Sequence, residues 1–199
     1  MTKSVVINKR EAILWAAVEL MTENGFDKTS ISQIANLAGV GKGTFYLYFQ
    51  SKSELVLGIA KFIVDDLLKS AESIAWNIET SLKQFIIDIT NLTYEITSKH
   101  KSLIGFCYSG TAYYSAFNEW DELYIPYYQW LLEKLRFYQE RGDIKKDYDL
   151  GYLSNYIVGL LEHGAEQHYL FEGVLSQTES NLEISKSTMN NFIYNALTR

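Results

Sequence analysis

Residues 39–52, GVGKGTFYLYFQSK, contain several residue types that could bind a phosphate or approach a DNA base. Lys42 supplies a cation, and Gly43 removes a side chain at a point where a helix could approach DNA closely. Thr44 can donate to a phosphate or contact a thymine methyl group, and the hydroxyls of two nearby tyrosines can reach phosphates. Lys52 begins a further predicted helix, whose free amide groups also favour an anion. The full set is Lys42, Gly43, Thr44, Tyr46, Tyr48 and Lys52.

Two short predicted helices carry this set. Ser30 and Gln33 have the spacing of a capping box, which predicts a helix start, and the turn at residues 38–41 contains two glycines. A second short helix is predicted at 42–48. Two short helices joined by a glycine-containing turn predict a helix-turn-helix over residues 29–48, in which the second helix enters the major groove.

Phe45 and Phe49 are predicted to hold the second helix against the core, because residues four apart share a face of a helix.

The pattern alone leaves other interpretations open, since paired short helices also occur in helical proteins that bind no DNA. An all-helical protein-interaction scaffold and a small helical enzyme are the alternatives. A scaffold would leave the lysines and tyrosines of residues 42–52 without a shared purpose.

Helical periodicity also dominates the rest of the chain, and a single proline argues against many hairpins. The sequence therefore predicts an all-α fold of about nine helices, with an N-terminal domain at residues 1–52 and a C-terminal domain at 53–199. Pro126 either starts a helix or kinks one. After a connecting helix near 52–76, helices are predicted near 80–98, 102–117, 120–141, 149–171 and 178–197.

Charge is spread unevenly over the 199 residues, whose formal net charge is −6. Residues 1–52 carry six Lys/Arg and four Asp/Glu, which gives +2, and residues 53–199 carry twelve and twenty, which gives −8. A mildly basic N-terminal part is compatible with a polyanionic partner.

Cys107 is the single cysteine, so no internal disulfide can form. Without a secretory signal or a long apolar run, a cytoplasmic protein that crosses no membrane is expected.

Motifs of the common enzyme and metal sites do not occur in the sequence. It contains no HExxH, CxxC, P-loop or GxSxG pattern. His163 and His168 are five residues apart, which poorly matches a shared helical face. No catalytic residue, metal site or cofactor is therefore predicted.

The run TSISQIANLAGVGKGTFYLYFQSKSEL, residues 29–55, resembles the characteristic segment of the TetR (tetracycline-repressor-type) family of bacterial transcription regulators. The close resemblance covers about residues 9–60, and the remainder is similar only in length and helical pattern. Two positions depart from the family: Gly41 stands where a serine is common, and Trp15 stands where a small or charged residue is more usual. The glycine removes a side-chain cap from the second helix, at a cost of about a few tenths of a kcal/mol.

The resemblance implies a regulator, usually a repressor, that binds a palindromic operator as a homodimer and leaves it when an effector fills the C-terminal domain. By position it implies contacts to double-stranded DNA at eight residues. Those near the phosphate backbone are Ser30, Thr44, Tyr46, Tyr48 and Lys52. Those at or near base edges are Ser32, Lys42 and Gly43.

Two apolar stripes on the last two predicted helices are the candidate dimer interface. Their candidate residues are Leu153, Ile157, Leu160, Gly164, Met189, Phe192 and Ile193. Both stripes could instead pack within one chain, but the resemblance implies pairing through a four-helix bundle made of these two helices.

Aromatic residues are concentrated between Phe106 and Trp130, where carboxylates also lie nearby. Helices this rich in rings can line an apolar cavity for a small aromatic, lipophilic or cationic effector. An ordinary aromatic core with an acidic surface is the alternative. The candidate effector-binding residues are Phe106, Tyr113, Tyr114, Phe117, Trp120 and Trp130.

Overall fold

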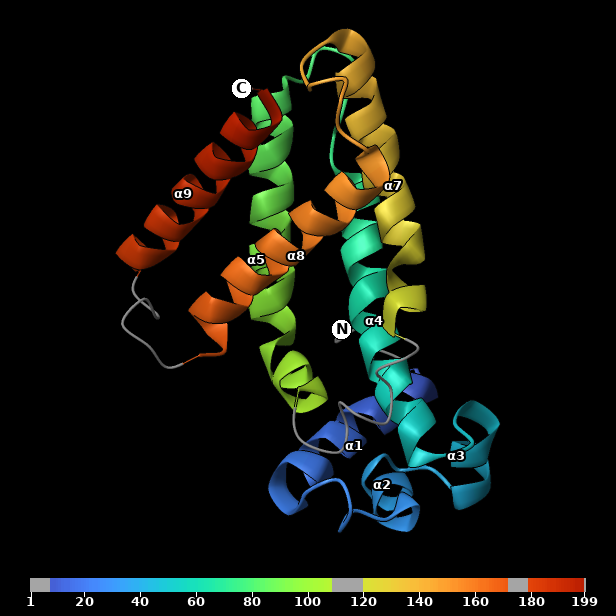
Figure 1. Cartoon of the computed structure of the whole chain (residues 1–199). Coiled ribbons are helices and arrows are strands. Elements are labelled where there is room, and N and C mark those ends of the chain that lie inside the picture. Colours follow the sequence, from blue (N-terminus) through green and yellow to red (C-terminus); the bar gives the residue numbers. More distant parts are fainter. Residues whose placement is uncertain (1–7, 109–119, 172–178, 199) are drawn as a thin grey trace, which may run out of the picture. The chain divides into compact units, whose positions relative to one another are not determined.

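A computed structural model describes residues 8–108, 120–171 and 179–198, and shows an all-helical chain (Figure 1). The described residues contain eight helices and no strand, which confirms the predicted fold class. Their bounds are α1 Lys9–Asn24, α2 Ile31–Leu37, α3 Lys42–Tyr48, α4 Lys52–Ser73, α5 Leu82–Cys107, α7 Trp120–Arg141, α8 Leu150–Tyr169 and α9 Glu179–Thr198.

The chain divides into two compact units. The head unit comprises Met1–Phe62 with Ser102–Asp121, and the body unit comprises Ile63–Lys101 with Glu122–Arg199. The predicted boundary at residue 52 marks the start of α4, whereas the compact units divide at Phe62. The first turns of α4 lie against the head, and a Cβ added at Gly58 would come within 2.5 Å of the Phe49 ring.

Aromatic packing within α3 and directly after it builds the centre of the head unit. Phe45 is fully buried and Phe49 is buried, with their ring centroids 6.0 Å apart. Ile13 of α1 and Ile34 of α2 are also fully buried. The prediction that Phe45 and Phe49 fasten the short helix to the core is confirmed.

The body unit has a core shared by the second half of α4 and by α5, α7, α8 and α9. Its buried residues include Leu67, Phe85, Tyr127, Leu161 and Ile193, one from each of these helices. In Figure 1, α8 runs obliquely to α5 and α7, and α9 packs on α8. Because five helices contribute to one core, its composition depends on contacts between distant parts of the sequence.

Two predicted helix boundaries fall differently in the structure. The helices predicted at 80–98 and 102–117 are joined over their described part into α5, which has a kink at His100, where φ is −107° and ψ is 15°. Residues 109–117 lie outside the described residues. Pro126 does not start a helix, because α7 begins at Trp120 and continues through the proline.

Candidate DNA-binding surface

The start of α2 is fixed by the predicted capping box. The Ser30 hydroxyl accepts the amide N–H of Gln33 at 3.3 Å, and the Gln33 side-chain oxygen accepts the amide of Ser30 at 2.8 Å. The Ser30 hydroxyl also donates to that same Gln33 oxygen at 2.7 Å. Ser30 therefore holds the first helix of the motif in place, and its predicted phosphate contact would be an additional role.

A tight turn separates α2 from α3. The amide of Val40 donates to the Ala35 carbonyl at 2.9 Å, and Gly39 adopts a φ of +67°, which a residue with a side chain rarely adopts. Helix α3 then begins at Lys42, and its N-cap residue Gly41 makes no side-chain hydrogen bond. The amide of Thr44 donates to the Gly41 carbonyl at 2.8 Å, so the helix forms without the serine that is usual at position 41.

Opposite faces of α3 have opposite character. Phe45 faces the core, whereas the side chains of Tyr46 and Tyr48 are 40% and 38% exposed. Lys42 and Gly43 are exposed, and Thr44 is half-buried. We call these five residues the recognition face, since the structure brings them together on one short helix: Lys42, Gly43, Thr44, Tyr46 and Tyr48. Ser32 lies exposed in the first turn of α2.

Lys52 has an intramolecular partner that the sequence did not indicate. Its ammonium group donates to the Phe26 carbonyl at 2.6 Å and lies 4.5 Å from the centroid of the Phe26 ring. Lys52 therefore ties the start of α4 to the loop between α1 and α2. The ammonium group has three N–H donors, so this bond leaves two N–H groups that could donate to a phosphate.

Two further residues of the motif were not singled out from the sequence. The Gln50 side-chain amide donates to the Tyr46 carbonyl at 3.0 Å and so satisfies the end of α3. Leu47 is 81% exposed, between the two tyrosines of the recognition face. Its position two residues after Phe45 could have indicated this, because that spacing reverses the direction of a helical side chain. An exposed leucine can contact the methyl group of thymine.

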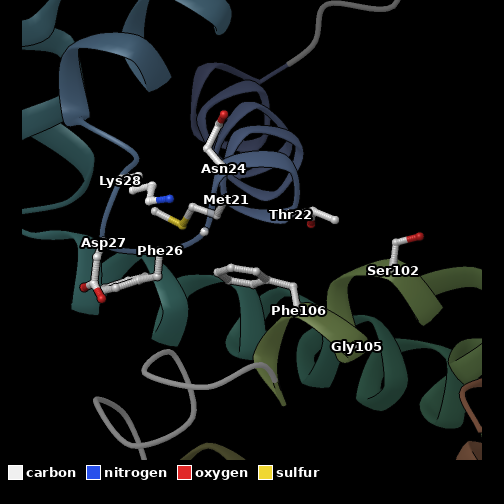
Figure 2. A pocket seen from close by; sticks show the side chains of 10 residues that line it. Met21, Thr22, Asn24, Phe26, Asp27, Lys28, Ser102, Gly105 and Phe106 are labelled. Atoms are coloured by element: carbon white, nitrogen blue, oxygen red, sulfur yellow. The ribbon is translucent and has the colours of Figure 1, made fainter.

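Trp15 is 46% exposed on α1. The end of the same helix, the loop after it and the last turns of α5 line a cavity of about 670 Å³ in the head unit (Figure 2). Met21 and Phe26 lie on one side of it, and Ser102 and Phe106 lie on the other.

The predicted effector residues are spread over the chain. Phe106 is buried in the head unit, and Trp130 is half-buried in the body unit, where it stacks on Tyr127 at 5.7 Å. Three others lie outside the described residues, and for Trp120 only the backbone is described. Those three are Tyr113, Tyr114 and Phe117. The effector set as a whole stays a prediction.

The predicted dimer residues divide into two groups. Ile157 and Ile193 are only 3% and 2% exposed and belong to the core of their own body unit, so their side chains do not reach the surface of α8 and α9. Leu160 and Phe192 are 39% and 59% exposed. The half-buried members are Leu153, Gly164 and Met189. A surface cavity of about 420 Å³ lies between α8 and α9 and is lined in part by Leu160, Gly164, Met189 and Phe192.

Reactive groups are sparse in the described residues. Burial raises the pKa of the Cys107 thiol to about 12, which fits a small apolar residue of the interior. Among the described side chains, no three histidines, cysteines or carboxylates group as metal ligands would. Nor does any described helix combine the length and apolar character needed to span a bilayer.

These features define a class of protein: a helix-turn-helix regulator whose DNA-reading helix is joined to a larger helical body. The family model described as "Bacterial regulatory proteins, tetR family" matches residues 13–59, and the model described as "Tetracyclin repressor-like, C-terminal domain" matches residues 85–197. The chain belongs to the TetR family of bacterial transcriptional regulators.

Individual relatives agree with this assignment. The chain is 34% identical over 192 residues to the uncharacterized HTH-type transcriptional regulator YvdT of Bacillus subtilis (strain 168), covering 95% of each protein. It is 32% identical over 92 residues to the fatty acid metabolism regulator protein of the same organism, covering 46% of this chain and 43% of that protein. Its fold resembles that of the fatty acid degradation regulator FadR from Bacillus halodurans, with a TM-score of 0.73, 19% identity, and 98% and 97% of the two chains covered.

Proposed function

We propose that this regulator is a repressor that binds a palindromic operator as a homodimer and is released by a small lipophilic effector. The observation that carries the proposal is the recognition face, where one lysine and three hydroxyl groups lie largely exposed on a helix that is anchored by a buried phenylalanine. Such groups bind phosphates and base edges. Operator DNA is a cytoplasmic molecule in bacteria, so we propose the cytoplasm as the place of action.

A second copy of the chain is the proposed occupant of the surface formed by α8 and α9. Leu160, Ile184 and Phe192 expose large apolar side chains there, around the cavity between the two helices. A contiguous apolar patch of this kind is typical of an interface. Two heads reading half-sites about 34–36 Å apart would also supply affinity that one mildly basic head lacks.

An effector within the body unit is supported by its aromatic interior. Tyr124 and Tyr128 pack at 5.7 Å, and Tyr127 stacks on Trp130. Two relatives carry fatty acid regulation in their names, so acyl compounds are one class to test. Release would require about 1–3 kcal/mol of coupling, because an effector shifts the equilibrium only by its differential affinity for the two states.

Footprinting on the DNA upstream of the chain's own gene tests the proposal. We expect salt-sensitive, two-fold symmetric protection, and a dimer by analytical ultracentrifugation. Phe192→Asp should give monomers and weaken protection, because it places a charge in the proposed interface. Ile78→Asp is the matched control, since Ile78 is 71% exposed but lies outside α8 and α9.

Protection without two-fold symmetry, or a Phe192→Asp variant that remains dimeric, would count against pairing through α8 and α9. The absence of binding to any DNA would instead favour the scaffold or enzyme alternative.

A further inference from the structure

Three polar side chains of the body unit lie on two helices that contact each other, α7 and α8. Tyr124 and Tyr127 are three residues apart on α7, so they share a face of that helix. Glu162 lies on α8, and its carboxylate accepts the Tyr124 hydroxyl at 2.7 Å. This contact places an acidic group beside the aromatic residues of α7.

Tyr127 is the unusual member of the group. It is 1% exposed, and among the described residues its hydroxyl has no hydrogen-bond partner of good geometry. Burial raises the pKa of Tyr127, and the Glu162 charge raises it further. The neighbouring Thr93 hydroxyl of α5 lowers this pKa, and its own O–H donates to the Ile89 carbonyl at 2.9 Å. Buried hydroxyls normally have a hydrogen-bond partner, so the Tyr127 hydroxyl is a candidate contact for a ligand.

Glu162 lacks a cationic partner among the described residues. It is partly buried, and burial raises its pKa to about 7, while the Tyr124 hydrogen bond lowers it and the charge of Glu166 raises it. No described lysine, arginine or histidine forms an ion pair with it. A carboxylate in such surroundings gains stability when a cation binds beside it.

Further aromatic rings of α7 lie against the two tyrosines of this group. Tyr124 lies against Tyr128, and the rings of Tyr127 and Trp130 are stacked with an interplanar angle of 9°. The faces of such rings attract cations as well as apolar groups. A ligand with an ammonium group and an apolar tail would satisfy both kinds of contact.

We propose that the Tyr127 hydroxyl and the Glu162 carboxylate bind the ammonium group of a lipophilic primary amine, which is the class of effector. The inference rests on the proposed function, since it names the ligand of the same body unit. A primary ammonium has three N–H donors and can donate to both oxygens at once. A fatty acid brings a second carboxylate beside Glu162, and a quaternary ammonium brings no donor.

Three probes with the same tail separate these possibilities: dodecylamine, dodecanoate and dodecyltrimethylammonium. Each is titrated calorimetrically into the full-length protein at pH 8, where the amine is protonated. We expect dodecylamine to bind most tightly, and Glu162→Gln to weaken it by roughly thirtyfold or more, as for loss of one partner of a buried charge pair. Glu140→Gln, an exposed glutamate of α7, is the matched control and should leave the affinity unchanged.

A second variant separates ligand binding from structure. Tyr127→Phe should weaken dodecylamine by about fivefold, the value of one hydrogen bond, without lowering the melting temperature of the unliganded protein. Equal affinities for dodecylamine and dodecanoate, or an amine affinity that Glu162→Gln leaves unchanged, would overturn the proposal. Operator binding is measured separately. A failure to bind DNA would contradict the proposed function, whereas the calorimetry alone tests whether an amine binds at Glu162.

Discussion

The head and body units place their candidate functional groups in opposite ways. The recognition face lies on one seven-residue helix, is largely exposed to solvent and is held from behind by a buried phenylalanine. The amine-binding group of the body is partly or fully buried and comes from two helices that are distant in sequence. A surface that reads a large polyanion can be built from local contacts, whereas a site that encloses a small molecule depends on tertiary packing.

The largest effect is expected when the buried phenylalanine behind the recognition face is removed. Phe45→Ala should destabilise the head by about 3–5 kcal/mol, because it empties a fully buried site. Leu47→Ala, two residues away and 81% exposed, should change stability by less than about 0.5 kcal/mol. Thermal and urea unfolding, followed by circular dichroism, measure both. Equal losses in the two variants would contradict the two-faced description of α3.

The second test concerns the partly buried carboxyl group of Glu162 in the body unit. The folded-state pKa of Glu162 is raised from 4.5 to about 7, so the folded protein retains a proton that the unfolded chain has lost. Wild-type stability should therefore fall by up to about 3 kcal/mol as the pH rises from 4 to 8. Glu162→Gln cannot ionise, so it should be more stable than wild type at pH 8 and similar at pH 4.

Urea unfolding at several pH values checks this expectation. Tyr124, Tyr127 and Glu166 are the titratable groups that act on Glu162, and none of them is removed in the variant. Parallel pH profiles for the two proteins would show that Glu162 is not held in a buried, uncharged form.

The smallest of the stability effects compares two glycines of α8. A Cβ at Gly164 would lie 2.7 Å from the Met189 side-chain terminus and 2.9 Å from the Tyr94 hydroxyl, which is bonded to Ser185 at 2.7 Å. Met189 can turn away, but the rigid Tyr94 ring must shift. Overpacking in Gly164→Ala should therefore lower the stability by about 1–3 kcal/mol, while the higher helix propensity of alanine raises it by about 1 kcal/mol.

Gly159 has open space at the same atom and should gain that helix term alone when replaced by alanine. Thermal unfolding compares the two variants, and we expect Gly159→Ala to have the higher melting temperature. The reverse order would mean that α5, α8 and α9 are not packed as closely as described.

Sequence alone predicted most of the head, because its signals are short-range. The Ser30 and Gln33 capping box, the uncapped start at Gly41 and the buried pair Phe45 and Phe49 each depend on residues at most four apart. Long-range contacts were not predictable in this way. The Lys52 ammonium meets a carbonyl 26 residues earlier in the chain.

The body shows the same limit more strongly. Tyr124 and Glu162 are 38 residues apart, and no local pattern pairs them. Helical periodicity identified an apolar stripe that contains both Ile157 and Leu160, but it could not separate the core residue from the exposed one. For the same reason, the sequence could not show which aromatic residues lie together in the folded body unit.

The central claim is that the exposed face of α3 binds the operator, and the salt dependence of binding by a Lys42→Ala variant tests it most directly. Fluorescence anisotropy with labelled upstream DNA would compare it with Lys146→Ala, which removes an exposed lysine of the body. We expect Lys42→Ala to bind more weakly and to lower the salt slope by about 0.9, the value of one phosphate contact, while Lys146→Ala matches wild type. An unchanged affinity and slope for Lys42→Ala would contradict the assignment of α3 as the DNA-reading helix.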